Sequence, residues 1–396
     1  MKRPIYLDNQ ATTPLDPEVL KAMLPYYQEK FGNAASAHHS YGQEGKEAVE
    51  QSRRILAQSI HAQPREIIFT SGATEAINLG LKGIAEKYTD RGKHIITQVT
   101  EHKAVIDTCK SLVQKGWKLT TLPVEPDGIV KPDAVADAIT RDTVLVAIMH
   151  ANNEIGTIQP IEKIGNICRK ENIFFLVDAS QSFGKLDLNM KLMKIDLLAA
   201  TAHKLYGPKG IGILFARQKD PKVKLKMQMD GGGHESGFRS GTLAVPLIVG
   251  FARAIELCLE QKVKESLRLG DLRDQLYAGI QDAHPEVILN GSHKKRLAHN
   301  LNLCFPGMDG ETIIMKMKSI ACSTGSACSS ASLDPSHVIK ALGRDTELAH
   351  SAIRFSLGRF NHAKEISDAI TVINQTLRDL KEKQLNRRKE NLGSIN

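Results

Sequence analysis

IFFLVDASQS, from Ile173 to Ser182, is the stretch that decides the fold. Five apolar residues follow one another with no polar residue between them, and the run ends at Asp178. A short apolar run of this kind is typical of a strand covered on both faces, as in a parallel sheet between two layers of helices. Because ligands bind beyond the carboxyl ends of such strands, we expect the residues from Asp178 onward to border a binding site.

Similar apolar runs lie on both sides of this stretch. They are EIIFT (66–70), HIIT (94–97), TVLVAIM (143–149), DLLAA (196–200) and GIGILF (210–215). Helical patterns separate several of them: one from about Thr74, one with Val105, Cys109, Leu112 and Val113 on its buried face, and one near Ile161, Ile164 and Cys168. Alternating strands and helices predict an α/β fold with a mostly parallel sheet and helices on both faces.

The pattern changes after Val245. Two long helical stretches over 246–283 are expected, then short strands near Val287 and Leu301 and helices near Glu311 and Val338. A closing amphipathic helix places Ile366, Ile370, Ile373, Leu377 and Leu380 on one face. We therefore predict a large domain over residues 15–255. A smaller α+β domain would comprise residues 1–14 and 256–396 and carry a loop at 321–335.

Composition indicates a globular protein of a reducing compartment. Of the 396 residues, 41% are hydrophobic and 24% charged, and no segment resembles a secretory signal or a membrane span. The cysteines are scattered without a CxxC pair, which favours free thiols and a cytoplasmic location; they are Cys109, Cys168, Cys258, Cys304, Cys322 and Cys328. The net charge of +9 permits binding to nucleic acid or acidic proteins, but much of the excess lies in KEKQLNRRKE (381–390), which is typical of a solvated helix end.

Two charged residues follow predicted strands. Asp178 could pair with a buried cation or a protonated ring nitrogen, or simply cap a helix. Lys204, in TAHKLYGPKG (201–210), could form a Schiff base if partial burial lowers its pKa, although a lysine near a turn is usually solvated.

Polar residues at other strand ends suggest a phosphate and a ring. SGATEA (71–76) has a glycine before a helix start and Thr74 within it, which predicts an anion site, while the nucleotide-binding glycine motifs are missing. His102 could stack on a ring or transfer protons, and Asn153 and Gln181 could bind the same ligand; each could also be an ordinary surface or turn residue.

Arg354 and Cys328 suggest the substrate. Arg354 stands in the apolar stretch SAIRFSLGRF (351–360), where its guanidinium needs either a substrate carboxylate or an internal salt bridge. Cys328 is at the centre of STGSACSSAS (323–332), a run of small residues suited to a thiol that carries a reacting atom, or to a surface loop with an incidental cysteine. Taken together, Asp178, Lys204 and the SGATEA anion site indicate a ligand with a basic ring nitrogen, an aldehyde and a phosphate.

The chain resembles the NifS/IscS-type cysteine desulfurases, class V aminotransferase relatives that are fold-type-I enzymes dependent on pyridoxal 5′-phosphate (PLP). The motifs run in order from about Ile5 to about Leu380: LDNQATTP, FTSGATEA, TEHKAV, NNEIG, VDASQS, HKLYGPKG, GGGHE, RSGT, GSACSSAS and IRFSLGRF. The segment around Cys328 is similar to that of the group with the longer catalytic loop.

The resemblance implies a role for each candidate residue. Lys204 would hold PLP covalently, Asp178 would pair with the ring nitrogen, and His102 would stack on the ring and assist proton transfer. The remaining cofactor contacts would be Asn153 and Gln181 near the ring oxygen, Ala73, Thr74, Thr201 and His203 at the phosphate, and Thr242 at the phosphate of the other subunit of a homodimer. Arg354 would bind the carboxylate of the substrate.

The implied reaction converts L-cysteine to L-alanine. Lys204 would remove the Cα proton, and the Cys328 thiolate would take the sulfur as a persulfide. A sulfur-acceptor protein, such as an iron–sulfur scaffold or a sulfur relay protein, would receive it for cluster assembly or for tRNA or cofactor thiolation. Cys328 would then also be a transient cluster ligand, the only metal contact expected. No membrane partner and no direct nucleic-acid contact are expected.

Two stretches depart from the family pattern. TAHK replaces the S-G-H-K that is common at the phosphate, with Thr201 keeping the hydroxyl and Ala202 expected to stiffen the turn. RRKENLGSIN replaces the segment with which the IscS type docks its scaffold protein. Other readings are a selenocysteine lyase or an aminotransferase of the same fold, and a basic RNA- or protein-binding module without catalysis.

Overall fold

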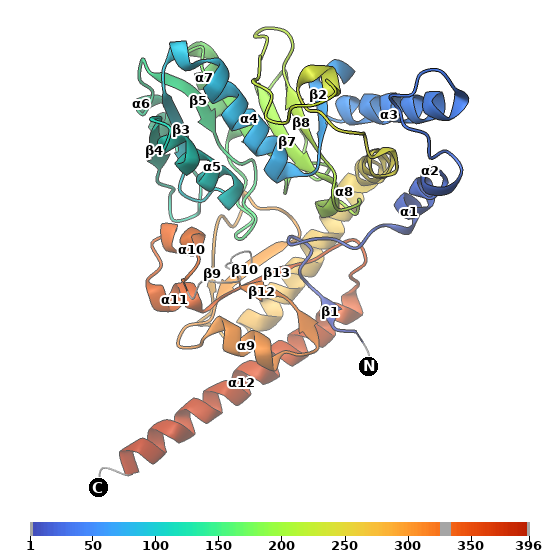
Figure 1. Cartoon of the computed structure of the whole chain (residues 1–396). Helices are drawn as coiled ribbons and strands as arrows, with labels where there is room; N and C mark the ends of the chain where they lie inside the picture. Colours follow the sequence, from blue (N-terminus) through green and yellow to red (C-terminus); the bar gives the residue numbers. More distant parts are fainter. Residues whose placement is uncertain (1–2, 325–333, 394–396) are drawn as a thin grey trace.

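The computed structural model describes residues 3–324 and 334–393, with side chains up to residue 386. It has two lobes, each built on its own main sheet, and one long helix, α8 (Val245–Gln281), runs from the first lobe into the second (Figure 1). We call them the large lobe, around the seven-stranded sheet, and the small lobe, around the four-stranded sheet.

The large lobe contains the sheet that the apolar runs predict. Its strands, in spatial order, are β2 (Ile67–Thr70), β8 (Gly212–Ala216), β7 (Leu197–Thr201), β6 (Phe174–Asp178), β5 (Thr143–Ala147), β3 (His94–Gln98) and β4 (Lys118–Leu122). The strands from β7 to β4 are parallel to their neighbours, and β8 is antiparallel to both β7 and β2. The prediction of a mostly parallel sheet is therefore confirmed.

Helices cover both faces of this sheet. The helices of the large lobe are α1 (Pro17–Met23), α2 (Pro25–Gln28), α3 (Ser40–Gln58), α4 (Ala73–Lys87), α5 (Lys103–Val113), α6 (Pro132–Asp137) and α7 (Ile161–Lys170). One core joins α1, α3, α7 and α8 to one face, and the other joins α4 and α5 to the opposite face. This two-sided burial explains why the central strands read as unbroken apolar runs. Val113 was predicted to be buried, but it is 44% exposed because it lies at the end of α5, and that prediction is wrong.

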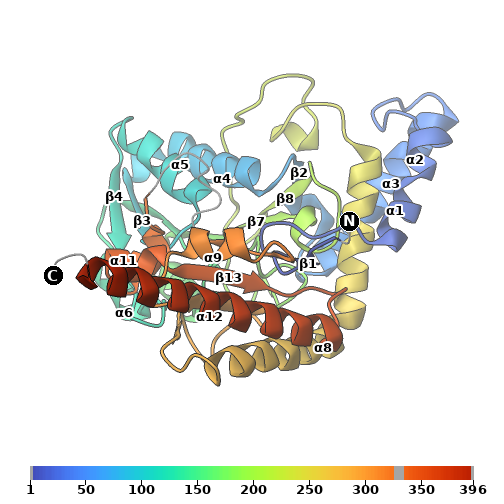
Figure 2. The ribbon, with the colours of Figure 1, turned by 90° about the horizontal axis from the view of Figure 1, so that it is seen from below.

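The small lobe has an antiparallel sheet in the order β12 (Ser323–Thr324), β13 (Ala352–Ser356), β10 (Asn300–Cys304) and β9 (Ile288–Leu289). Its helices are α9 (Gly310–Lys316), α10 (His337–Ala341), α11 (Thr346–His350) and α12 (Ala363–Gly393). The N-terminal strand β1 (Ile5–Tyr6) pairs with β11 (Ile320–Ala321) of this lobe. Figure 2 shows α12 crossing the lobe alongside α8, α9 and β13, with its predicted apolar face in the core.

Helix α8 differs from the expectation of two helical stretches. It continues through 37 residues, because the sequence between its apolar halves consists largely of good helix formers. Its first half packs in the large lobe through residues such as Phe251 and Ile255, and its last half packs in the small lobe through Leu272 and Leu276. The predicted domain boundary at 255/256 falls inside this helix and stays a prediction. No helix in the described part of the chain is long and apolar enough to cross a membrane.

Candidate active site

A cavity of about 460 Å³ lies beyond the carboxyl ends of the parallel strands. Its lining includes nine of the residues singled out from the sequence: Ala73, Thr74, His102, Asn153, Asp178, Gln181, Thr201, His203 and Lys204. They come from five separate motifs, each at or after the end of a different strand, and the strand order brings them together. Open α/β sheets bind ligands at this position.

Asp178 is the last residue of β6 and is 5% exposed. Its Oδ1 accepts hydrogen bonds from the backbone N–H (2.8 Å) and the hydroxyl of Ser180. These bonds fix the orientation of the carboxylate at the floor of the cavity. A carboxylate held in this way can pair with a protonated ring nitrogen.

His102 caps the start of α5, with its Nδ1 accepting from the N–H of Ala104 at 3.1 Å. Burial lowers the pKa of His102, and the charge of Lys204 lowers it further, while Asp178 raises it in part. The ring is therefore neutral at pH 7, with its proton on Nε2 because Nδ1 is an acceptor. A flat, neutral ring is suited to stacking on an aromatic cofactor.

The start of α4 forms part of the cavity wall, where the sequence predicts an anion site. Gly72 precedes this 15-residue helix with a φ of 158°, a backbone conformation that favours glycine. The free N–H groups of the first turn and the hydroxyls of Thr74 and Thr201 can bind an anion. His203 adds a neutral imidazole, because burial lowers its pKa to about 4, and its Nδ1 is 3.1 Å from the hydroxyl of Thr12.

The Lys204 turn, which we define as residues 202–207, follows β7. The carbonyl of Ala202 accepts from the N–H groups of Leu205 and Gly207, both at 3.0 Å. A Cβ at Gly207 would lie 2.9 Å from that of Ala202, so the alanine fits here because a glycine faces it. The side chain of Lys204 lines the cavity.

The sequence reasoning missed the N-terminal segment 8–16 as part of the site. Ala11 and Thr12 line the cavity, and the carbonyl of Gln10 accepts from Nε2 of Gln181 at 3.0 Å. Short polar residues without periodicity give no secondary-structure signal. The motif LDNQATTP, used only to support the family resemblance, was the available clue.

Arg354 lies on β13, with only 3% of its side chain exposed. Its guanidinium forms an ion pair with Asp8 (2.7 Å) and donates to the hydroxyl of Ser323 (2.7 Å) and the carbonyl of Asn153 (2.8 Å). Of the two readings of this residue, the internal salt bridge is the one present. The contact with Asn153 places the guanidinium beside a cavity residue, and binding of a substrate carboxylate stays a prediction.

Thr242 and Cys328 are not part of the described cavity. Thr242 is exposed and does not line it, so its expected role in the other subunit stays a prediction. Arg239, three residues before Thr242, forms an ion pair at 2.8 Å with Glu75, which lines the cavity. Cys328, with its expected catalytic and metal contacts, lies outside the described residues.

Cys322, to which the sequence assigns no role, packs against the core of the small lobe. Burial raises the pKa of its thiol to about 12. Because the thiolate is the reactive form, this cysteine is unreactive at neutral pH and acts as a packing residue.

A second cavity of about 440 Å³ adjoins the first and shares His102 and Asn153 with it. Residues from α5, from the start of α10 and from the segment before α10 line it, including Lys103 and His337. The second cavity therefore lies next to the first, where the start of α10 in the small lobe faces α5 of the large lobe.

The residues present fit PLP. The cavity volume is within the range of small-molecule sites. It combines an anion site, a carboxylate and a lysine, the three groups that the phosphate, the ring nitrogen and the aldehyde need. In addition, the buried Oε1 of Gln181 has no hydrogen-bond partner among the described residues, as expected of a group that faces a ligand.

Comparison with known proteins identifies the class of protein. The Aminotransferase class-V family profile matches residues 5–368, and the chain therefore belongs to this family. The predicted family, fold class and PLP cofactor are thereby confirmed.

Close relatives and solved structures narrow the assignment. The chain is 50% identical over 383 residues to "Cysteine desulfurase IscS" of Dechloromonas aromatica, which covers 96% of this chain and 94% of that protein. A solved structure described as "NIFS-LIKE PROTEIN" has a TM-score of 0.89 and 37% identity over 95% of this chain and 99% of that chain. Another, "SspA in complex with cysteine", has a TM-score of 0.81 and 36% identity over 90% of this chain and 100% of that chain.

Proposed function

We propose that this protein is a PLP-dependent cysteine desulfurase that converts L-cysteine to L-alanine and transfers the sulfur to Cys328. The observation that carries the proposal is the single cavity in which an anion site, Asp178, His102 and Lys204 meet. Curated relatives at 50% identity over almost the full chain have this activity in their names.

The residues of the cavity would hold the cofactor at three points. Ala73, Thr74, Thr201 and His203 would bind the phosphate, Asp178 the ring nitrogen, and Asn153 and Gln181 the ring oxygen, with His102 on the face of the ring. Bound PLP would supply an electron-withdrawing ring that stabilises the negative charge left at the Cα of the substrate when its proton is removed.

The chain itself would supply the acid–base and nucleophilic groups. Lys204, once replaced by the substrate amine, would take the Cα proton, and Arg354 would orient the substrate carboxylate. The Cys328 thiolate would attack the substrate sulfur: an S–S bond forms at Cys328, the C–S bond of the substrate breaks, and the carbon skeleton leaves as alanine after taking up protons.

The expected partners belong to the same proposal. In a homodimer, Thr242 of one subunit would contact the phosphate held by the other. A sulfur-acceptor protein would remove the persulfide sulfur in the cytoplasm, for iron–sulfur cluster assembly and for thiolation of tRNA or cofactors.

The test compares two cysteines of the same segment. Cys328→Ala is expected to abolish formation of alanine and sulfide from L-cysteine without added thiol, and ³⁵S from labelled cysteine should no longer attach to the protein. Cys322→Ala, the matched control, should keep activity within about 2-fold, because a buried protonated thiol is not a nucleophile. Full activity of Cys328→Ala would exclude the proposed mechanism.

The same measurements separate the alternative functions. An aminotransferase would transfer an amino group to a keto acid whether or not Cys328 is present. A selenocysteine lyase would prefer selenocysteine over cysteine. A non-catalytic nucleic-acid-binding protein would take up no PLP and would show salt-sensitive tRNA binding.

A further inference from the structure

Tyr206 has an unusual backbone conformation. It lies two residues after Lys204, is 3% exposed, and has a φ of 65° in the left-handed region. A bulky residue rarely adopts this conformation, which persists only where the surrounding structure holds it. The contacts that hold Tyr206 therefore determine the course of the Lys204 turn.

Thr13, in the N-terminal segment, holds the turn on both sides of Lys204. Its backbone N–H and its hydroxyl both donate to the carbonyl of His203, at 2.9 and 3.0 Å. The same hydroxyl accepts from the N–H of Tyr206 at 2.8 Å. Thr13 is 2% exposed, so water does not compete for these bonds.

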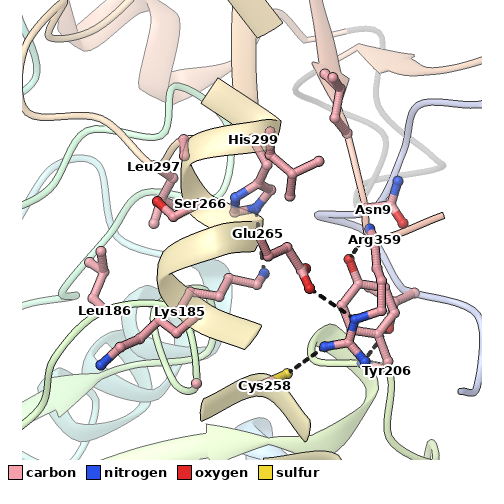
Figure 3. Close-up of a pocket in the computed structure, with 16 residues that line it drawn as sticks. Asn9, Lys185, Leu186, Tyr206, Cys258, Glu265, Ser266, Leu297, His299 and Arg359 are labelled. Atoms are coloured by element: carbon pink, nitrogen blue, oxygen red, sulfur yellow. Dashed lines mark hydrogen bonds and ion pairs between the residues drawn. The ribbon is translucent and has the colours of Figure 1, made fainter. Parts of the chain in front are cut away.

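The remaining polar groups of Tyr206 are also held. Its carbonyl accepts from the N–H of Asp16 (3.0 Å), and its hydroxyl accepts from the N–H of Arg359 (2.6 Å). The guanidinium of Arg359 lies 4.2 Å from the centre of the tyrosine ring and forms ion pairs with Asp16 (2.7 Å) and Glu265 (2.9 Å). Figure 3 shows Arg359 between the Tyr206 ring and the α8 residues Glu265 and Cys258.

We propose that Thr13 is a positioning residue for Lys204: its hydroxyl, together with the Arg359 contacts, holds Tyr206 in the left-handed conformation that directs the lysine to the cofactor aldehyde. The proposal rests on the proposed role of Lys204 as the residue that bonds PLP. Thr13 lies outside the cofactor cavity and acts only through the backbone of the turn.

The test measures two ligands on the cofactor-free full chain. PLP bonds to Lys204 through its aldehyde, whereas pyridoxamine 5′-phosphate has the same ring and phosphate but no aldehyde. Thr13→Val removes the hydroxyl at similar volume and is expected to weaken PLP binding about 10-fold, roughly the effect of losing one or two hydrogen bonds. Pyridoxamine 5′-phosphate binding should change less than about 2-fold, because it does not depend on the lysine. Thr13→Ser should restore PLP binding.

Thr157→Val is the matched control. Thr157 is 0% exposed, and its hydroxyl likewise donates to a carbonyl (Asp127, 2.8 Å) and accepts from a backbone N–H (Ser292, 3.0 Å), but far from the turn in sequence. In this variant, the ratio of the affinity for PLP to the affinity for pyridoxamine 5′-phosphate should stay as in the wild type.

The proposal would be overturned if Thr13→Val weakened the binding of PLP and of pyridoxamine 5′-phosphate equally, or changed neither affinity. If Thr13→Val does not fold, Tyr206→Phe decides in its place: it removes the hydroxyl contact with Arg359 and should shift the ratio in the same direction, and an unchanged ratio would refute the idea. Failure of the proposed function gives a different result from failure of this proposal. In that case the wild-type protein itself would not bind PLP more tightly than pyridoxamine 5′-phosphate.

Discussion

Replacement of Arg354 by glutamine should weaken both folding and substrate binding, and the two effects can be measured separately. The guanidinium makes three contacts within 2.8 Å, to Asp8, Ser323 and Asn153. Hydrogen bonds to charged groups contribute about 1.5–3 kcal/mol each, but Asp8 is 20% exposed and is partly solvated once its partner is removed. We therefore expect a loss of about 2–4 kcal/mol in the free energy of unfolding.

The effect on catalysis should be of similar size but separable. If Arg354 binds the substrate carboxylate, its loss should cost about 2–4 kcal/mol of binding, or about 30- to 1000-fold in kcat/KM for L-cysteine. Asp8→Asn breaks the same ion pair and leaves the guanidinium in place. It should lower the stability by about 1–2 kcal/mol and change kcat/KM by less than about 3-fold.

The assay combines urea denaturation with alanine formation at several cysteine concentrations for the wild type, both single variants and the double variant. The reasoning is refuted if Asp8→Asn reduces kcat/KM as strongly as Arg354→Gln. It is also refuted if Arg354→Gln lowers the free energy of unfolding but leaves kcat/KM unchanged, since Arg354 would then form only its internal salt bridge.

Two further predictions concern buried carboxyl groups. Burial raises the pKa of Glu154 from 4.5 to about 7, so the folded protein holds this proton more tightly than the unfolded chain does. The contribution of Glu154 to the free energy of unfolding is therefore fully present below pH 4.5 and is lost as the pH rises to 7. Glu154→Gln should thus match the wild type near pH 4.5 and be more stable by up to about 3 kcal/mol above pH 7 in urea denaturation; an equal difference at both pH values would contradict this. Glu235→Gln should cost about 3–5 kcal/mol in thermal or urea unfolding, because it leaves the Arg53 guanidinium buried without its partner at 2.7 Å. Glu50→Gln removes a half-exposed partner of the same arginine and should cost less than about 1 kcal/mol; a similar loss in both variants would contradict the assignment.

The parts of the fold that could be predicted are those with two-sided burial. β5 and β6 are apolar throughout because helices cover both faces, and such runs are readable without a structure. β4 was not expected: it is at the edge of the sheet, where most of its residues keep contact with solvent. The two halves of α8 were read separately because each half faces a different core, and nothing in the local pattern reveals that the helix is continuous.

The cavity residues could be predicted because each follows a strand. Asp178 and Lys204 lie at or just beyond the carboxyl ends of neighbouring parallel strands, so the topology brings them together. Thr13 could not be predicted in this way, since its contacts are with residues about 190 positions further along the chain. The partner of Arg354 was undetermined for the same reason, because Asp8 is 346 positions away.

The continuity of α8 has a mechanical consequence. At about 1.5 Å per residue, its 37 residues form a strut about 55 Å long that is embedded in the cores of both lobes. Hinge closure needs a few residues free to change their φ and ψ angles, and an uninterrupted helix axis does not supply them. We therefore expect the two lobes to move little relative to each other, so that a change in access to the cavity would come from shorter segments at its rim.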